Sequence, residues 1–221
     1  MKRLLIIFIV LFVLGCLVLL ATQADSLQSG ELPQHQADAG NGRQMFYAGG
    51  CASCHSSDNK ASELPHLGGG LEMHTEFGVF RAPNISPHLS SGIGDWSMLE
   101  FVNAMHLGTS PRGKHYYPAF PYVSYNRMSL QDIMDLKVFI DTLPAVATPS
   151  IDHSLSFPWN IRVGLGLWKL ANLGEAHIQE LDESDKLLER GRYLAEGPGH
   201  CGECHTPRNW TGGMDTSRWF A

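Results

Sequence analysis

Two copies of one five-residue pattern constrain this chain more than any other feature. Each copy has two cysteines separated by two residues and followed directly by a histidine, as Cys51-Ala52-Ser53-Cys54-His55 and as Cys201-Gly202-Glu203-Cys204-His205. Two thiols at this spacing on one turn can add to the two vinyl groups of a single porphyrin, and the adjacent imidazole then reaches the iron. The pattern therefore predicts two covalent c-type haems, attached by Cys51, Cys54, Cys201 and Cys204, with His55 and His205 as proximal iron ligands.

Other interpretations of a single CxxC pair are a zinc site, a redox disulfide or chance. A structural zinc site needs four converging ligands, and a thioredoxin-like pair expects a strand followed by a helix. Here each pair carries its own histidine, and only Cys16 lies outside the two patterns. The sequence therefore favours haem attachment.

The N-terminus predicts a membrane segment. Lys2 and Arg3 precede an unbroken apolar run over residues 4–21, and acidic residues follow it. Eighteen residues in a helix span about 27 Å, close to the thickness of a bilayer core. We expect residues 1–22 to be an anchor or signal that crosses the cell (inner) membrane once. The basic N-terminus then places the haem domains on the periplasmic side.

Two alternatives compete with an uncleaved anchor. A secretory signal has the same order of regions, and residues 21–24 offer a fair cleavage site, although its apolar core is usually shorter. The stretch Val13-Leu14-Gly15-Cys16 faintly resembles a lipoprotein processing box, but the apolar run continues after Cys16. All three interpretations export the rest of the chain. Residues 23–40 are polar, contain Gly and Pro, and predict a flexible tether.

Composition excludes one class of partner. The net charge is −6, with no basic stretch beyond Lys2-Arg3, so we expect no nucleic-acid binding through phosphate neutralisation.

The apolar periodicities are helical, and they predict an all-α fold. The flanks of the two motifs repeat, because Gly42-Arg43 and Gly191-Arg192 precede them and a Gly-rich break comes just before each first cysteine. Glycine inside a helix is costly, so the matching positions suggest close helix–helix approach.

The repeat predicts tandem cytochrome c domains. We expect the first over residues 41–145, a connector over 146–184, and the start of a second domain over 185–221. The second unit is short and has no equivalent of the two later helices of the first, so it is expected to be truncated. Its iron either has an open or partner-supplied distal position, or belongs to a longer chain.

The first domain offers helix signals and a distal ligand. Ser97 and Ser129 each cap an apolar-periodic helix, the first ending near Gly108 and the second before Pro144. The intervening loop, residues 115–122, is rich in Pro and aromatic residues. Met128 directly follows this loop, and we predict it as the distal iron ligand, with core packing as the alternative. Met98, Met105 and Met134 lie on predicted helical faces, and Met214 lies in a predicted turn. Histidines 66, 74, 88, 106 and 115 are further possible ligands.

Within the connector, residues 161–173 are apolar nearly all round. Such a helix is buried or lies at an interface. We favour packing between the two haem units, with contact to the membrane surface or a partner subunit as the alternative.

Three further strings carry a family resemblance: Ala82-Pro83-Asn84-Ile85-Ser86-Pro87, Gly92-Ile93-Gly94-Asp95-Trp96-Ser97 and Tyr117-Pro118-Ala119-Phe120-Pro121-Tyr122. With them, the chain resembles the membrane-anchored di- and multihaem cytochrome c subunits of bacterial alcohol, gluconate and fructose dehydrogenases. Residues 199–209 are similar to the attachment segment of a later haem in that family. Many members have Met where this chain has Phe120, so the resemblance favours Met128 as the distal ligand. The strings also motivate Arg81, Asn84 and Trp96 as surroundings of the haem propionates.

The resemblance implies electron transfer rather than catalysis. Expected partners are a periplasmic dehydrogenase catalytic subunit, other redox proteins or quinone, and the membrane, with electrons passing to quinone or a terminal oxidase. One alternative is a haem enzyme, a peroxidase or small-molecule reductase that uses an open haem site. Another is a subunit whose main role is to dock the dehydrogenase.

Overall fold

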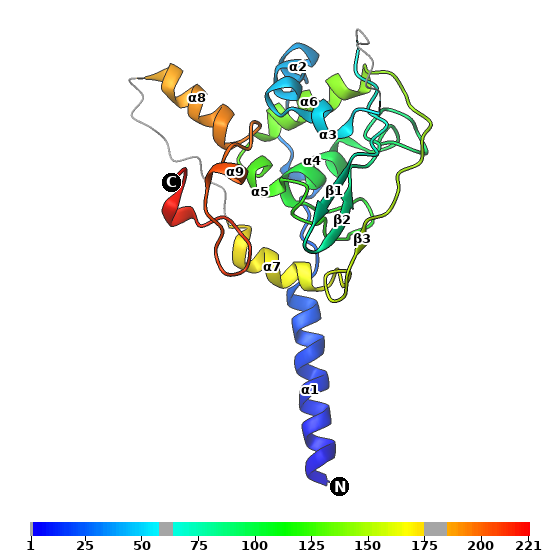
Figure 1. Cartoon of the computed structure of the whole chain (residues 1–221), viewed down its shortest axis with the longest axis vertical. Helices are drawn as coiled ribbons and strands as arrows, with labels where there is room; N and C mark the ends of the chain where they lie inside the picture. Colours follow the sequence, from blue (N-terminus) through cyan, green and yellow to red (C-terminus); the bar gives the residue numbers. More distant parts are fainter. Residues whose placement is uncertain (1, 58–63, 175–184) are drawn as a thin grey trace.

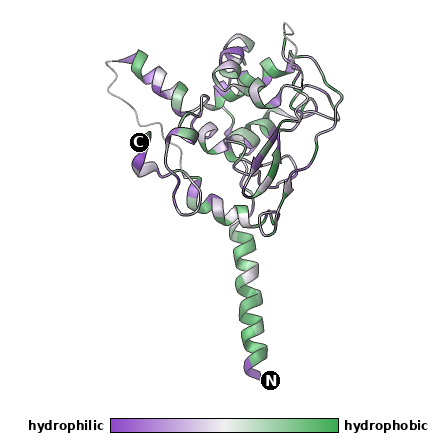
Figure 2. Cartoon of the chain, in the orientation of Figure 1, coloured by the Kyte–Doolittle hydropathy of each residue, from purple (hydrophilic) through white to green (hydrophobic). Residues whose placement is uncertain are grey.

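A single apolar helix, α1 (Lys2–Ala21), projects from the rest of the chain (Figure 1). The computed structural model describes residues 2–57, 64–174 and 185–221. The apolar window of α1 has a mean hydropathy of 3.5 and none of it is buried against the protein, and Figure 2 shows the apolar colour running along almost its whole length. This helix is therefore long and apolar enough to cross a membrane, as either an anchor or a signal sequence.

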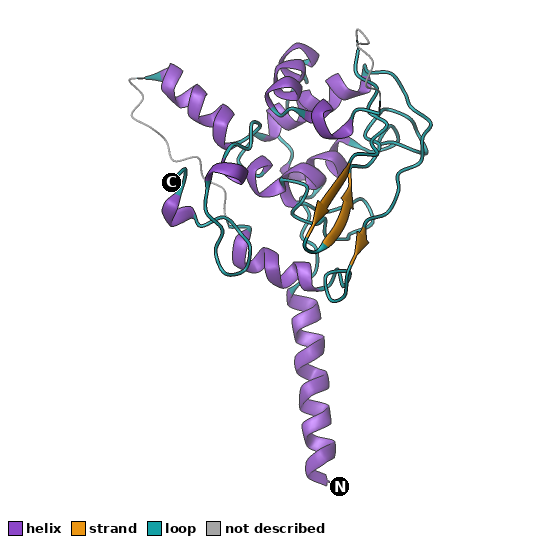
Figure 3. Ribbon diagram, viewed as in Figure 1, coloured by secondary structure: helices purple, strands orange, loops and turns teal. Residues whose placement is uncertain are grey.

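The regular elements of the domain above α1 are mainly helices, joined by long loops, as Figure 3 shows. The elements of its first part are η1 (Ser29–Glu31), α2 (Ala39–Ala48), α3 (Cys51–His55), β1 (Glu72–Thr75), β2 (Gly78–Arg81), α4 (Met98–Leu107), α5 (Tyr122–Tyr125) and α6 (Leu130–Asp141). They are followed by β3 (Ser154–Leu155), α7 (Gly164–Asn172), α8 (Lys186–Glu196), α9 (Gly202–His205) and η2 (Thr216–Arg218).

The two capped helices are confirmed. Ser97 accepts a hydrogen bond from the backbone of Glu100, whose carboxylate accepts one from the backbone of Ser97, and α4 ends at Gly108 in a left-handed conformation. Ser129 caps α6 in the same way through the backbone N–H of Asp132. Both helices bury an apolar face in one core, with α2 packed against α6.

The expectation of an all-α chain is wrong in one region. Strands β1, β2 and β3 form a small antiparallel sheet in that order. Only Phe80 of β2 is buried, against the rings of Tyr117 and His153. The strands are too short, and too exposed on one face, to leave a clear alternating pattern in the sequence.

Residues 23–40, predicted to be a flexible tether, lie against the domain instead. The backbone N–H of Leu27 donates to Asn103 Oδ1 at 2.7 Å, and the Asn103 amide donates back to the Leu27 carbonyl. Further along, the buried Asp135 carboxylate accepts hydrogen bonds from His35 and from the backbone of Asp38, both at 2.7 Å. These bonds, together with the Asn41 amide, hold the pKa of Asp135 below its usual value despite its burial.

The predicted close approach of helices is confirmed at one glycine of the repeat. A Cβ at Gly42 in α2 would lie 2.0 Å from the carbonyl oxygen of Asp135 in α6. The backbones of the two helices can therefore meet only because this position lacks a side chain. Gly191, its counterpart in α8, has nothing within 4 Å of the same point, so the expectation is wrong there.

The helix predicted over residues 161–173 is shorter and more exposed than expected. It forms as α7, in which Gly166 and Lys169 are buried while Leu167 and Leu170 are exposed. The end of the predicted connector, residues 175–184, lies outside the described residues. Beyond it, Tyr193 and Leu194 at the end of α8 pack against the core of the first unit.

Candidate functional site

The first cysteine motif sits on a short helix directly after a break in the chain. Helix α2 ends at Ala48, and Gly50 adopts a left-handed conformation with φ 57°. The motif then forms α3, so that Cys51, Cys54 and His55 lie within little more than one turn of one helix. The sequence predicted this arrangement of helix, glycine break and attachment turn.

His55 is oriented by a backbone carbonyl. Its Nδ1–H donates to the oxygen of Pro83 at 2.8 Å, which fixes the tautomer and leaves the Nε2 lone pair available for a metal. Burial lowers the pKa of His55, so the imidazole stays neutral, as a ligand must. Sequence reasoning placed Pro83 in a family string but did not identify its carbonyl as the partner of His55.

The surroundings of the first motif fit a haem. Cys51 and Ala52 pack against the apolar core, together with Ile85 and Trp96. Burial raises the pKa of the Cys51 thiol to about 12, so this sulfur behaves as a neutral, apolar group suited to a thioether. When bound, a haem supplies one-electron redox chemistry at its iron, and these residues would attach it, ligate it and exclude water from it.

Met128 lies in the core between the two motifs. Met128 is only 4% exposed. It belongs to the apolar cluster against which Cys51 packs. A Cβ at Gly197, just before the second motif, would lie 3.4 Å from Met128 Cγ. This placement leaves open both the predicted ligand role and the packing alternative.

The second motif repeats the local geometry of the first. Helix α8 ends at Glu196, and His200 takes the left-handed position directly before Cys201, with φ 40°. Gly50 holds the matching position before Cys51. Unlike the first motif, the second is open, because Cys201, Cys204 and His205 are all exposed.

The structure brings the two attachment turns into direct contact. The imidazole Nε2 of His200 lies 3.3 Å from the carbonyl oxygen of Gly49, and its ring meets the ring of Tyr125 edge-on at 5.8 Å. A Cβ at Gly49 would lie 3.2 Å from the carbonyl oxygen of Pro198. The glycine-rich breaks that precede Cys51 and Cys201 therefore touch one another, although 150 residues separate the two cysteines in the chain.

Polar contacts reinforce this junction. Ser124 Oγ donates to Glu203 Oε1 at 3.0 Å, and the same carboxylate pairs with Arg208 at 2.9 Å. Arg127 pairs with the buried Glu196 at 3.3 Å, and its guanidinium stacks over the ring of Trp219 at 4.5 Å. The second attachment segment is thus held to the first unit by apolar, ionic and aromatic contacts together.

Other residues singled out in the sequence have structural roles. The Asn84 amide donates to the carbonyls of Val146 and Thr148 while its oxygen accepts from Ser86, so the predicted propionate contact has no free donor there. Arg81 pairs with Glu72 across the sheet. Trp96 lies at the edge of the core. Phe120 packs against the rings of neighbouring tyrosines.

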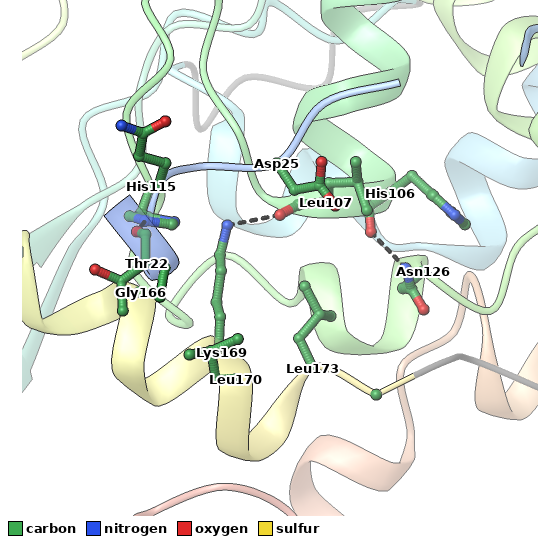
Figure 4. A pocket seen from close by; sticks show the side chains of 13 residues that line it. Thr22, Asp25, His106, Leu107, His115, Asn126, Gly166, Lys169, Leu170 and Leu173 are labelled. Atoms are coloured by element: carbon green, nitrogen blue, oxygen red, sulfur yellow. Dashed lines mark hydrogen bonds between the residues drawn. The ribbon is translucent and has the colours of Figure 1, made fainter. Parts of the chain in front are cut away.

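A cavity of about 470 Å³ lies at the other end of the domain, and Figure 4 shows its lining. Lys169 projects from α7 and donates to the carbonyls of Leu107 and Gly108 at 2.6 and 2.8 Å. Burial lowers its pKa to about 8. His115 donates through Nε2 to the carbonyl of Thr22 at 2.8 Å, and burial lowers its pKa also. No residue of either motif lines this cavity.

The first unit is similar to a known family. Residues 39–144 match the sequence model of the family described as cytochrome c. The matched residues include the first motif, the Pro83 carbonyl and Met128. The second motif lies outside the matched region.

Individual relatives match a larger part of the chain. It is 50% identical over 185 residues to a protein named diheme cytochrome c-type from Cereibacter sphaeroides, covering 83% of this chain and 62% of that one. It is 34% identical to the fructose dehydrogenase cytochrome subunit of Gluconobacter japonicus, over 85% of this chain and 38% of that one. It is 37% identical to the gluconate 2-dehydrogenase cytochrome c subunit of Pantoea cypripedii, over 77% and 38% respectively. The chain therefore spans less than two thirds of the length of each of these relatives, and the predicted resemblance is confirmed.

Proposed function

We propose that the chain is an electron-transfer subunit carrying two covalent c-type haems, and that residues 39–144, which match the cytochrome c family model, form its first haem domain. Cys51 and Cys54 would attach the first and Cys201 and Cys204 the second, with His55 and His205 as proximal ligands. The contact between the two attachment turns at Gly49, Pro198 and His200 is the observation that carries the proposal. It keeps both sites in one rigid junction, which suits electron exchange within the chain.

The residues of the chain have distinct tasks in this proposal. The Pro83 carbonyl holds His55 in the orientation and tautomer that a metal requires. The apolar core around Cys51 excludes water, which lowers the reorganisation that accompanies a change of charge at the site. Met128 is the proposed distal ligand of the first iron, because it is buried in that core beside the junction. A thioether there raises the reduction potential relative to a second imidazole.

The names of the relatives guide the choice of partner. Those from Gluconobacter japonicus and Pantoea cypripedii are cytochrome subunits of dehydrogenases. We propose that this chain also receives electrons from a dehydrogenase catalytic subunit and passes them towards quinone or a terminal oxidase. In this proposal α1 anchors the chain in the cell membrane, with the domain on the periplasmic side, as the basic residues before α1 favour.

The count of haems is tested by intact mass and by pyridine haemochrome absorption of the purified full chain. Two haems per chain are expected, with one lost in Cys201→Ser/Cys204→Ser and the other retained. A single haem in the unaltered protein would contradict the proposal for the second motif.

The distal ligand is tested by Met128→Ala, with Met134→Ala as the control. Both side chains are buried, so both changes create a cavity, but only Met128 is a proposed ligand. We expect Met128→Ala to lower the potential of one haem and to allow it to bind carbon monoxide, while Met134→Ala does neither. Identical spectra and potentials in the two variants would identify Met128 as a packing residue.

A further inference from the structure

One side of α7 is apolar and exposed. Val163, directly before the helix, Leu167 and Leu170 follow one another at helical spacing, and the leucines are 53% and 68% exposed. Phe157 and Trp159, in the turn before the helix, are also exposed. These five residues form what we term the α7 apolar face.

The other sides of α7 are covered. Gly166 and Lys169 are buried against the domain, and Trp168 donates from Nε1 to the carbonyl of Thr211 in the C-terminal segment at 3.0 Å. The basic residues of this region turn inwards. Lys169 bonds the carbonyls at the end of α4, and Arg162 stacks over the ring of Tyr117 at 4.6 Å. Residues 153–174 contain no acidic residue, so the exposed face carries no negative charge.

Helix α7 is fixed at the level where α1 ends. A Cβ at Gly166 would lie 2.3 Å from the carbonyl oxygen of Thr22, the first residue after α1. The same carbonyl accepts the hydrogen bond from His115, and Figure 4 shows Thr22, His115 and Lys169 close together in the lining of the cavity. Figure 1 places α7 across the end of α1, at the side of the domain from which α1 projects. The apolar helix α1 and the helix that carries the α7 apolar face therefore adjoin one another (Figure 2).

We propose that the α7 apolar face lies at the boundary between the headgroups and the acyl chains of the same bilayer that α1 crosses, so that two elements hold the domain on the lipid surface. The inference rests on the proposed role of α1 as an anchor. An anchor whose end is packed against α7 brings this face to the membrane surface, since α1 must leave the bilayer near Thr22. Exposed leucines on a short helix, with the exposed Trp159 in the turn before it, suit that environment.

Membrane contact through both α1 and α7 would fix the orientation of the two attachment turns. A domain on a flexible tether would rotate freely above the membrane, whereas contacts at both α1 and α7 fix its tilt. The helices of the two attachment turns, α3 and α9, then stay at a set height above the lipid, farther from α1 than α7 is (Figure 1).

The test uses the full, haem-loaded chain in nanodiscs of phosphatidylcholine that contains a photoactivatable diazirine in its acyl chains. After irradiation, mass spectrometry identifies the peptides that carry lipid. Lipid on peptides from both α1 and residues 157–172 is expected. Lipid on α1 alone would overturn the proposed membrane contact of α7 and would leave the proposed anchor role of α1 intact. Lipid on neither would refute the anchor itself, so the two failures are distinguishable.

Single cysteines give the same test at residue level. In a Cys16→Ser background, Leu167→Cys and Leu170→Cys are compared with Leu187→Cys, which is 87% exposed on α8 and distant from α1. With a water-soluble maleimide in lipid-only nanodiscs, we expect labelling at 167 and 170 to be much slower than at 187. Equal rates at the three positions would overturn the proposal. Protection that is present in native membranes but lost in lipid-only nanodiscs would assign the face to a protein partner instead, and would equally overturn it.

Discussion

Substituting alanine for the glycine of each Gly-Arg pair should change stability in opposite directions. At Gly42 the added Cβ would lie 2.0 Å from the Asp135 carbonyl oxygen and 2.9 Å from Phe139 Cβ. Ordinary van der Waals contact begins near 3.4 Å, so α2 and α6 must separate by about 1.4 Å. At Gly191 no atom lies within 4 Å of the new Cβ, and nothing has to move.

The magnitudes follow from these contacts. Overpacking costs about 1–3 kcal/mol, and the obstacle at Gly42 is backbone that no rotamer change can relieve, so the upper end applies. Alanine is more favourable than glycine inside a helix by about 1 kcal/mol, and this gain applies at either position. We therefore expect Gly42→Ala to lower the free energy of unfolding by about 2 kcal/mol, and Gly191→Ala to raise it by up to about 1 kcal/mol.

The assay is urea unfolding of the full, haem-loaded chain in detergent micelles. Circular dichroism in the Soret region is the suitable signal, because it reports on the domain rather than on α1, which stays helical in the micelle. A midpoint that falls for Gly42→Ala and rises or holds for Gly191→Ala is expected. Shifts of both variants in the same direction would refute the close approach of α2 and α6.

Three further changes probe the junction and the end of α1. Gly49→Val should push Pro198 away and speed proteolytic release of residues 185–221, whereas Gly164→Val, with no neighbour at that point, should not. The pKa of Lys169 is about 8 in the folded chain and 10.5 in the unfolded chain, so the unfolded chain binds more protons between these values. Stability should therefore rise from pH 8 to 10.5, and Lys169→Met should abolish the rise in an unfolding series. Because burial lowers the pKa of His115 from 6.5, stability should fall as the pH drops below 6.5, and less so in His115→Gln; an unchanged pH profile would contradict this.

Signals that act over a few residues were sufficient to predict the helices around the site. Ser97 and Ser129 each satisfy backbone groups three residues away, so the residues that begin α4 and α6 are readable from the sequence alone. The attachment turns are local in the same sense, because a left-handed residue directly precedes the first cysteine of each. The histidine at that position of the second copy carries no such signal, since glycine is the residue that indicates a left-handed conformation.

Long-range polar contacts explain where sequence reasoning failed. Residues 23–40 have the composition of a tether, but the partners that hold them are Asn103, 76 residues from Leu27, and Asp135, 97 residues from Asp38. No sequence signal near residues 23–40 predicts these partners. The apolar composition of α7 misled in the opposite direction, because it suggested buried leucines, whereas Lys169 is buried and Leu167 and Leu170 are exposed.

The packing of the second unit on the first could not be predicted from the sequence. Two independent domains on a connector would each close their own core, yet Tyr193 and Leu194 of the second unit pack into the core of the first. The Tyr193 hydroxyl also accepts from the backbone of Ser129, at the start of α6. A substitution near one attachment turn should therefore alter the surroundings of the other, so the potentials of the two proposed haems are expected to shift together rather than independently. Measured shifts confined to one haem in Gly49→Val would show that the contact does not couple them.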